Sequence, residues 1–302
     1  MSNIRGIINL IKPVGISSFR AVKDIKKIAN VKKAGHTGTL DLLATGVLPI
    51  CINKATKVIP FLNEITKEYI AEIILGKATR TLDKEGEIIK QNDNWKNLRY
   101  REIEQVINSF KGQLKQIPPM YSALHHKGKR LYKLAREGKS IKRSPRNINI
   151  YSINISKIDL PVIRLKIKCS KGTYIRALAR DIGENLKVGA YLSFLIRTRS
   201  GPFTIEEAVT FTELNKKNDD IFNNLTELDF YLDYPAFNVK NEALKKAVNG
   251  NILQENDFNN RIEDIEQGDL IMVYSPEDEF ISINKFDVVD NVLIFKPERV
   301  FI

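Results

Sequence analysis

One carboxylate, Asp41, stands in a segment whose other residues are mostly small or apolar. Residues 35–49 read Gly-His-Thr-Gly-Thr-Leu-Asp-Leu-Leu-Ala-Thr-Gly-Val-Leu-Pro. The glycines permit unusual backbone angles, and the Thr and Ala side chains leave room for a ligand to approach. An acid among apolar neighbours is costly, so Asp41 is a candidate nucleophile or base. A turn residue or a helix cap is the structural alternative for Asp41.

A buried carboxylate needs a cation, and the best candidate is Arg176. It ends the run Lys-Gly-Thr-Tyr-Ile-Arg at residues 171–176, where a helix is expected to follow a strand. The first turn of a helix is a rigid support for a guanidinium, and an arginine partner would keep Asp41 ionised at neutral pH. A phosphate contact or a surface charge is the alternative for Arg176.

Other kinds of site are not indicated. The glycine-rich loop lacks the Gly-Lys-Ser/Thr ending of a P-loop and does not match the dinucleotide-binding fingerprint. Cys51 and Cys169 have apolar neighbours and no Cys or His at metal-ligand spacing. We therefore expect buried thiols and no metal site.

The charge of the chain is unevenly distributed. Residues 1–200 hold 39 basic and 15 acidic residues, a balance of +24, whereas residues 201–302 hold 9 and 21, a balance of −12. Within the basic part, Lys111 to Arg146 carries eleven basic residues and one acidic residue, together with Tyr121 and Tyr132. This mixture suits a nucleic-acid backbone with exposed bases nearby. A merely solvated lysine-rich surface is the alternative.

The supporting elements follow from residue periodicity. A strand is predicted over 6–10, and a helix from Ser17 or Ser18 to about Ala29 with Phe19 among its inward-facing residues. Tyr69 begins an alternating strand to residue 75, and another helix is predicted from about residue 174 to 186. A capping-box pattern at Thr204 and Glu207 predicts one more helix.

Strands interspersed with helices predict an α/β (α+β) domain over residues 1–235. The acidic residues 236–302 predict a small, separate β-rich domain that includes a short helix. No apolar run approaches the roughly 20 residues that cross a bilayer. We therefore expect a cytoplasmic protein without membrane association.

Five blocks of sequence resemble, in order and spacing, the motifs of bacterial tRNA pseudouridine-55 synthases, the TruB family. They are Gly-His-Thr-Gly-Thr-Leu-Asp at 35–41, Ala-Thr-Gly-Val-Leu-Pro at 44–49, Pro-Pro-Met-Tyr-Ser-Ala at 118–123, Lys-Gly-Thr-Tyr-Ile-Arg at 171–176 and Arg-Thr-Arg-Ser-Gly at 197–201. The likeness covers essentially the whole chain, and it includes the turn at Lys12-Pro13.

The resemblance implies a role for individual residues. Asp41 would be the catalytic carboxylate, with Arg176 as its salt-bridge partner. Tyr69 would stack on the target uracil, and ordinary core packing is the alternative for it. The remaining substrate-binding positions implied by the resemblance are Tyr174, a second ring against the nucleotide; His36, which occupies the space that the base leaves; Leu195, a wall of the pocket; and Lys12.

The resemblance also implies an activity and a fold. The activity is the isomerisation of uridine 55 to pseudouridine in the T-loop of tRNA, on a flipped-out nucleotide and without a cofactor. The fold is a mixed, largely antiparallel sheet flanked by helices, with residues 111–146 as an insertion that grips the T-arm and residues 236–302 as a PUA-like domain. We expect a monomer with no obligatory protein partner.

Two other functions fit the same residues. One is a catalytically silent RNA-binding or RNA-folding protein, and the other is a sibling synthase that acts on another RNA, with or without a guide complex. The intact pair of Asp41 and Arg176 argues against the first. The basic insertion argues against the second, because guide-dependent relatives lack it.

Four positions depart from the family pattern. Proline, aspartate, lysine and histidine are usual where this sequence has Leu42, Arg80, His125 and Tyr191, respectively. Arg80 puts in doubt any supporting bond that an acid at this position would make. The acidic C-terminal domain does not suit strong phosphate binding, and we expect it to contribute stability or to orient the RNA weakly.

Overall fold

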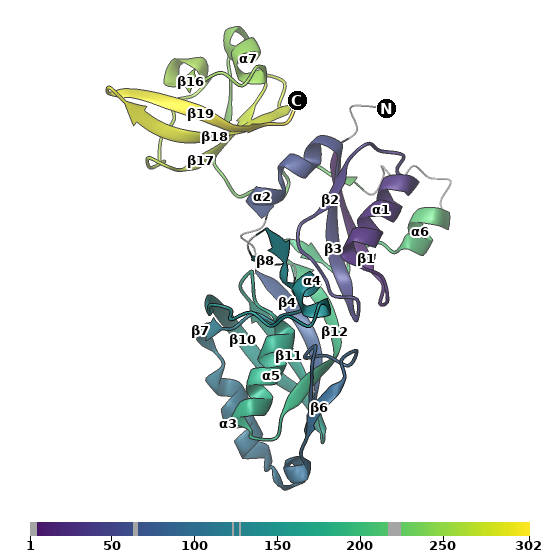
Figure 1. Cartoon of the computed structure of the whole chain (residues 1–302). Coiled ribbons are helices and arrows are strands. Elements are labelled where there is room, and N and C mark those ends of the chain that lie inside the picture. The colour runs from purple at the N-terminus through teal and green to yellow at the C-terminus, as the bar shows by residue number, and fades with distance from the viewer. Residues whose placement is uncertain (1–4, 63–65, 123, 127, 217–224) are drawn as a thin grey trace.

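The computed structural model describes residues 5–62, 66–122, 124–126, 128–216 and 225–302, and Ala123 of the third motif lies outside them. The described strands form a ten-stranded sheet, a five-stranded sheet and two short hairpins. The two large sheets belong to successive parts of the chain and lie at different ends of the molecule (Figure 1). This arrangement confirms the predicted α/β fold class.

The ten-stranded sheet runs in the order β14-β1-β3-β12-β4-β11-β10-β7, with β2 paired to β3 and β13 to β12. All its pairs are antiparallel except the parallel pair of β3 and β12. Its strands are β1 (Gly6–Lys12), β2 (Ala34–His36), β3 (Ala44–Ile52), β4 (Lys67–Leu75), β7 (Gly112–Gln116), β10 (Arg146–Asp159), β11 (Val162–Cys169), β12 (Ala190–Ser200), β13 (Phe203–Thr204) and β14 (Leu225–Thr226). The hairpins are β5 (Lys77–Thr79) with β6 (Ile88–Gln91), and β8 (His125–His126) with β9 (Lys129–Arg130).

Several of the described helices pack against this sheet and complete its core, whereas α7 packs in the C-terminal module. The α-helices are α1 (Ser18–Ile28), α2 (Ile59–Leu62), α3 (Tyr100–Ser109), α4 (Leu131–Arg136), α5 (Ile175–Asn185), α6 (Phe211–Lys216) and α7 (Asn241–Val248). The 3-10 helices are η1 (Asn53–Lys57), η2 (Asp93–Asn97) and η4 (Glu255–Asp257). Ile25 of α1, Ile107 of α3 and Leu178 of α5 are all buried in one hydrophobic cluster with the strands.

Two expectations about helices were wrong. Phe19 is 75% exposed, because α1 buries the face that carries Ser18, Ala21 and Ile25. Thr204 does not begin a helix, because it lies in β13 and its carbonyl accepts a hydrogen bond from Asn9. The next helix, α6, begins at Phe211.

A reciprocal capping box starts that helix six residues after the predicted one. The backbone N–H of Thr210 donates to the Glu213 carboxylate at 2.7 Å, and the backbone N–H of Glu213 donates to the Thr210 hydroxyl at 3.2 Å. The helix is capped by a Thr-x-x-Glu box, the type that was predicted, but at Thr210 and Glu213 instead of Thr204 and Glu207.

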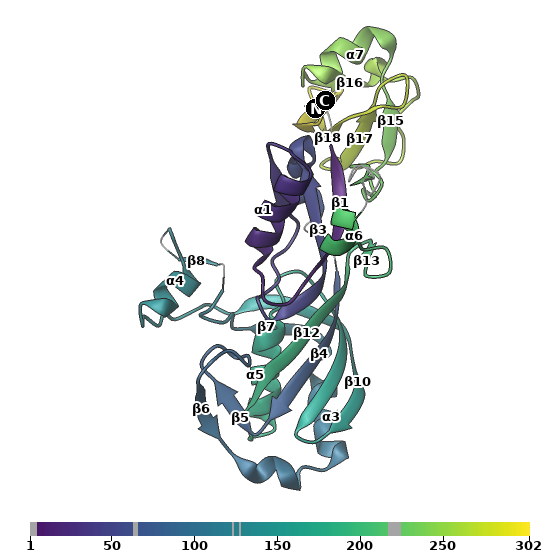
Figure 2. The same cartoon turned by 90° about the vertical axis from the view of Figure 1, so that its right-hand side faces the viewer.

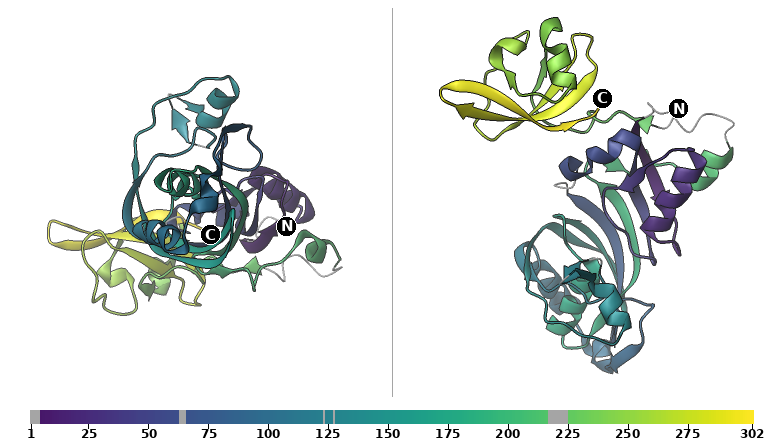
Figure 3. Two further views of the ribbon diagram at one scale, coloured as in Figure 1. Left: turned by 90° about the horizontal axis from the view of Figure 1, so that it is seen from below. Right: turned by 45° about the horizontal axis from the view of Figure 1, so that its top comes forward.

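The C-terminal five-stranded sheet runs in the order β15-β17-β18-β19-β16. Its strands are β15 (Ala236–Asn238), β16 (Leu253–Gln254), β17 (Leu270–Tyr274), β18 (Phe280–Val289) and β19 (Val292–Val300). Figures 1 and 3 show this module at one end of the molecule, next to α2. Phe280 and Phe301 of the module are buried in the same hydrophobic cluster as Ile7 and Val47 of the large sheet. The C-terminal module and the body therefore share a core.

The basic insertion stands away from the sheet. Figure 2 shows α4 and β8 projecting to one side of the body that carries β4, β12 and α5. The chain leaves the sheet at Gln116, the end of β7, and returns at Arg146, the start of β10, where these two residues pair with each other. The insertion is thus carried on an antiparallel strand pair at the edge of the sheet.

Candidate active site

The Asp41 loop joins β2 to β3 and is tied to the start of α1. The Ser18 hydroxyl accepts a hydrogen bond from the Leu40 N–H at 2.8 Å and donates one to the Leu40 carbonyl at 3.0 Å. The N–H of Gly15 donates to the carbonyl of Leu42 at 2.9 Å. Leu42, at the position where proline was expected, is exposed, and its backbone bond to Gly15 still fixes the chain beside Asp41.

The side chain of Arg197, from β12, also fixes the Asp41 loop by hydrogen bonds. Its side chain is fully buried; Nε donates to the carbonyl of Val47 at 2.7 Å, and Nη2 donates to the carbonyl of Gly38 at 3.1 Å. Gly46 permits the close approach of β3 to β12, because a Cβ there would lie 2.2 Å from the carbonyl oxygen of Arg197. Two of the sequence blocks, at 44–49 and 197–201, are thus matched to each other in space.

Asp41 and Arg176 form a two-pronged ion pair. Nε of Arg176 lies 2.8 Å from Oδ2 of Asp41, and Nη2 donates to Oδ1 at 2.9 Å. The Arg176 side chain is 6% exposed and that of Asp41 is 37% exposed. The pair was predicted from the sequence without a geometry. Its geometry leaves one side of the carboxylate open while its charge is matched by a fixed cation.

A second acid, Asp83, supports Arg176 from behind. Its Oδ2 lies 3.4 Å from Nη1 of Arg176, and both side chains are 6% exposed. Nη1 also donates to the carbonyl of Thr81 at 3.2 Å, and Nη2 donates to the carbonyl of Tyr121 at 2.8 Å. Burial raises the pKa of Asp83, while the Thr81 hydroxyl and Arg176 act in the opposite direction. Arg176 is therefore held between two carboxylates.

Asp83 makes the supporting contact with Arg176 that Arg80, in place of the usual aspartate, cannot make. Arg80 points outward, 61% exposed, and pairs with Glu87 at 3.2 Å. The supporting acid comes from three positions later, where the loop is fastened to β12 by the N–H of Lys84 donating to the carbonyl of Leu192 at 3.0 Å. The family pattern has its aspartate at position 80, and the sequence did not predict that Asp83 would contact Arg176.

A cavity of about 240 Å³ opens above the ion pair. Five of the predicted residues line it: Asp41, Tyr69, Tyr174, Arg176 and Leu195. Tyr69 and Leu195 come from the adjacent strands β4 and β12, and both are nearly buried, with 7% and 5% exposure. Burial raises the pKa of Tyr69 to about 12, so its hydroxyl is neutral at physiological pH. The cavity has apolar and aromatic walls and a charged end.

Gln116 fixes Tyr174 at the mouth of this cavity. Its side-chain amide donates to the carbonyl of Tyr174 at 3.1 Å, and its side-chain oxygen accepts from the Tyr174 N–H at 2.8 Å. Gln116 is also the last residue of β7, where the insertion over residues 111–146 leaves the sheet. The insertion and the aromatic residue that caps α5 are therefore connected by one side chain, which the sequence did not single out.

His36 and Lys12 do not line the cavity. Burial, with Arg197 and Lys67 nearby, lowers the pKa of His36, so the imidazole is neutral at physiological pH. Lys12 is fully buried, and its ammonium donates to the carbonyls of Pro13 and Ile16 at 2.8 Å. Burial lowers the pKa of Lys12 to about 8. These contacts make Lys12 a support of the turn before α1, which differs from the direct substrate contact that we expected.

The other departures lie away from the ion pair. His125 is exposed in β8, where it pairs with Arg130, and Tyr191 lies in β12 opposite Ile74. Neither residue lines the cavity that contains Asp41. Their side chains therefore leave the proposed catalytic groups unchanged.

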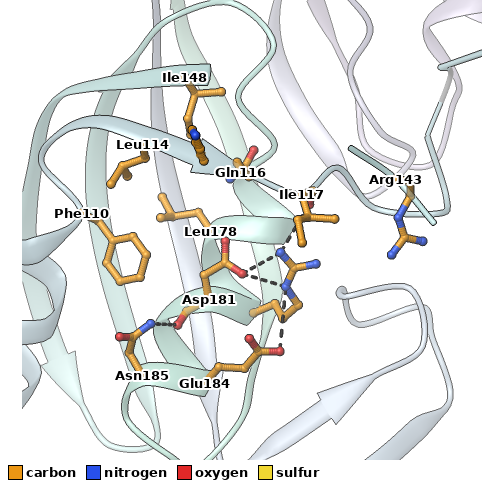
Figure 4. A pocket seen from close by; sticks show the side chains of 12 residues that line it. Phe110, Leu114, Gln116, Ile117, Arg143, Ile148, Leu178, Asp181, Glu184 and Asn185 are labelled. Carbon is orange, nitrogen blue, oxygen red and sulfur yellow. Dashed lines mark hydrogen bonds and ion pairs between the residues drawn. The ribbon is translucent and has the colours of Figure 1, made fainter. Parts of the chain in front are cut away.

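A separate cavity of about 430 Å³ lies at the base of the insertion. Figure 4 shows an apolar side formed by Phe110, Leu114 and Leu178, and a charged side with Asp181 and Glu184. Arg180 also lines this cavity. Nη2 of Arg180 lies 2.6 Å from Oδ1 of Asp181 and 3.3 Å from the carbonyl of Ile117. These contacts fasten the beginning of the insertion to α5 and do not include the predicted catalytic residues.

The remaining expectations about chemistry concern cysteines, metals and membranes. Cys51 and Cys169 are free and buried, as predicted, and burial raises their pKa to about 12 and about 11, respectively. The described residues contain no cluster of three or more His, Cys, Asp or Glu side chains placed to hold a metal. None of the helices in the described part of the chain has the length and apolar composition that crossing a membrane takes.

Two family models match the chain. Residues 26–175 match the model described as "TruB family pseudouridylate synthase (N terminal domain)", and residues 176–232 match that of the "tRNA pseudouridylate synthase B C-terminal domain". The boundary between these models falls within the motif at 171–176. Together they include Asp41, Tyr69 and Arg176.

Curated relatives match over most of their length. The tRNA pseudouridine synthase B of Clostridium tetani is 43% identical over 93% of this chain and 96% of its own. That of Clostridium novyi is 45% identical over 93% of this chain and 95% of its own. That of Francisella philomiragia is 50% identical over 70% of each chain.

Solved structures share the fold. A chain from a Cbf5-Nop10-Gar1 complex aligns with a TM-score of 0.74 and 28% identity, over 98% of this chain and 85% of its own. A chain from an H/ACA RNP bound to a substrate RNA containing 2'-deoxyuridine aligns with a TM-score of 0.72 and 27% identity, over 98% and 85%. Both alignments extend over the large sheet and the C-terminal module.

Proposed function

Because the chain belongs to the TruB family of pseudouridylate synthases, we propose that it isomerises uridine 55 in the T-loop of tRNA, with Asp41 as the catalytic carboxylate. The observation that carries the proposal is the ion pair of Asp41 and Arg176 at the charged end of a cavity with aromatic walls. A carboxylate that is ionised, fixed and open on one side is what a nucleophile or base requires.

The cavity suits a single pyrimidine nucleotide taken out of its stack. Tyr69 and Tyr174 offer ring faces, Leu195 forms a wall, and Asp41 reaches the same space. Turning a base out of a loop costs a few kcal/mol, which aromatic stacking and phosphate contacts can offset. The basic insertion over residues 111–146, beside Tyr174, is the part of the chain that we assign to the T-arm.

The reaction needs only what these residues provide. The N1–C1′ bond breaks, the uracil turns, and C5 joins C1′, with no redox change and no transferred group, so we expect no cofactor. Attack at C1′, addition to C6 and removal of the 2′ proton are all open to Asp41. Neutral His36, at the end of β2 and before the loop, is assigned to the space that the base leaves.

A second candidate is a synthase that works on another RNA within a guide complex. The fold match to chains of the Cbf5-Nop10-Gar1 and H/ACA RNP complexes favours it. Full-length similarity to proteins named tRNA pseudouridine synthase B favours the first proposal. We therefore expect the chain alone, as a monomer, to act on naked tRNA.

Release of tritium from tRNA transcripts labelled at C5 of uridine tests the proposal. Wild-type protein alone should release close to one equivalent per tRNA, and a transcript with cytidine at position 55 should release none. Asp41→Asn should release none, because the amide is neither a nucleophile nor a base.

Asp159→Asn is the matched control, since it makes the same change at an exposed aspartate, the last residue of β10. It should behave as wild type. Release from the cytidine-55 transcript would reject the assigned position, and release by Asp41→Asn would reject the assigned residue. Activity that requires added guide RNA and proteins would favour the second candidate.

A further inference from the structure

A lysine that sequence reasoning did not select lies at the cavity. Lys67 is the first residue of β4, two residues before Tyr69 on the same face of the strand, and it lines the cavity together with Asp41. Among the residues that the structure describes, no carboxylate forms an ion pair with its ammonium group. Asp41, the one acid that lines the cavity, is paired with Arg176.

A second cation lies beside Lys67. A Cβ built on Gly38 would lie 3.2 Å from Nζ of Lys67 and 3.5 Å from Nη1 of Arg197. That Nη1 atom is buried, and the side-chain group that interacts with the Arg197 guanidinium by a hydrogen bond is the neutral hydroxyl of Tyr69. Two positive groups therefore meet beneath the catalytic loop without an acid between them. A site with excess positive charge is suited to an anion.

The proposed reaction produces such an anion. When the C1′–N1 bond breaks, its electron pair passes to the uracil, and the negative charge spreads over the ring nitrogens and the carbonyl oxygens. The ring then turns, C5 forms the bond to C1′, C5 loses its proton, and N1 takes one up. Charge is present only between these two bond changes, so a fixed cation near the ring lowers the barrier.

We propose that Lys67 is a further catalytic residue, whose ammonium group pairs with a carbonyl oxygen of the detached uracil while the ring turns. Arg197 lies behind it and supports the same charge distribution. This inference rests on the proposed function, since it assigns a role within that reaction. It holds for each of the three routes open to Asp41, because all of them break the same bond.

The surroundings of Lys67 make this role dependent on pH. Burial, reinforced by Arg197, lowers the pKa of Lys67 to about 8. The charged and titratable groups that face it are Arg197 of β12, Cys169 of β11, His36 of β2, and Asp41, Tyr69, Tyr174 and Arg176 around the cavity. Above pH 8 Lys67 loses its proton and its charge, so the rate should fall there.

The experiment compares three variants in single-turnover tritium release, with tRNA binding measured separately. Lys67→Met removes the charge and keeps most of the apolar stem. It should slow the reaction about 100-fold to 1000-fold, the range seen when one group that stabilises developing charge is removed. Binding of tRNA should change less than threefold, because the cation acts after the base has entered the cavity. Lys67→Arg keeps the charge and should retain most of the rate.

Lys166→Met is the matched control, since Lys166 is exposed in β11 opposite Ile70, whose side chain points away from the face of Tyr69. It should react as wild type. The rate of wild type should fall as pH rises through about 8, and this fall should be absent from Lys67→Arg, whose guanidinium stays charged.

Three results would overturn the inference. The first is a rate for Lys67→Met within threefold of wild type. The second is a loss of tRNA binding by Lys67→Met as large as its loss of rate, which would make Lys67 a phosphate contact. The third is a fall in rate above pH 8 that persists in Lys67→Arg, and this comparison decides the matter even if Lys67→Met does not fold. Absence of release by wild type would instead reject the proposed function, so the two failures are distinguishable.

Discussion

Arg176 contacts three other residues of the site besides Asp41. One guanidinium contacts both carboxylates and the carbonyls of Thr81 and Tyr121, so three separate segments are fixed around it. A cation with five donors in one plane can satisfy such a set, and a lysine cannot. The orientation of Asp41 therefore depends on residues that never approach the cavity.

Replacing Asp83 by alanine tests this dependence. The change leaves the buried Arg176 without one partner and should lower the free energy of unfolding by about 1–3 kcal/mol. A shift of the guanidinium would also misplace Asp41, so the rate of tritium release should fall about tenfold to 100-fold. Arg80→Ala, at the exposed end of the same loop, is the control and should change neither quantity. A wild-type rate for Asp83→Ala would mean that the Tyr121 and Thr81 carbonyls alone hold Arg176.

Residues that carry a recognisable motif could be predicted, and residues placed only by the tertiary fold could not. Asp41 and Arg176 were assigned to each other from residue type and motif alone. Asp83 was missed because Thr-Arg-Thr-Leu-Asp reads as an exposed polar loop, and 93 positions separate it from Arg176. Lys67 was missed because a lysine before an alternating strand reads as a solvated strand end. The tertiary fold buries all or part of both side chains, which the local sequence does not indicate.

At the scale of elements, the parallel contact of β3 with β12 sets the position of the Asp41 loop. Residues 44–46 pair with 195–197, which places Leu195 at the cavity and the Arg197 side chain under the loop. Gly46 has φ +103 and faces the Arg197 backbone at the point of closest approach. A larger residue there would separate the two strands.

Gly46→Ala should therefore lower both stability and activity. A Cβ would lie 2.2 Å from the Arg197 carbonyl oxygen, which the backbone cannot accommodate without moving. Gly112→Ala is the matched control, because Gly112 has φ +105 and no atom within 4 Å of the added Cβ. The control should cost only the backbone strain, about 1–2 kcal/mol, and Gly46→Ala clearly more, as measured by urea unfolding. Equal losses in the two variants would show that strand contact at Gly46 is unimportant.

Residue periodicity predicted most helices and strands. It failed where the same local sequence pattern fitted two helix faces or two helix starts. The apolar residues of β10 change phase between Ile150 and Ile153, and the register of β10 shifts there, between Ile150 and Ser152, and again between Ile155 and Lys157. Phe19 was placed inside because its type is apolar, yet the helix face is set by Ala21 and Ile25. Thr204 and Thr210 both precede a glutamate by three residues, and only the strand pairing of Thr204 with Arg199 decides between them.

At the scale of the whole molecule, the acidic C-terminal module is joined to the basic body by apolar packing. Phe301 stacks on Phe280 with ring centroids 4.9 Å apart, in the cluster that also contains Ile7, Val47 and Cys51 of the body. Arg5 adds a hydrogen bond to the Phe301 carbonyl at 2.9 Å. Composition predicted a separate module from the change of charge, but it gave no sign of this shared core. The module thus covers apolar surface of the ten-stranded sheet.

Phe301→Ala tests whether that contact serves stability rather than RNA binding. Removing a fully buried phenylalanine costs about 3–5 kcal/mol, and here the cavity would open between module and body. We expect the body to melt at a lower temperature while affinity for tRNA changes less than tenfold, since the module carries a negative charge balance. Phe295→Ala, in the core of the module alone, is the control. It should destabilise the module and affect the body less. A hundredfold loss of tRNA affinity in a folded Phe301→Ala protein would instead assign the module to RNA recognition.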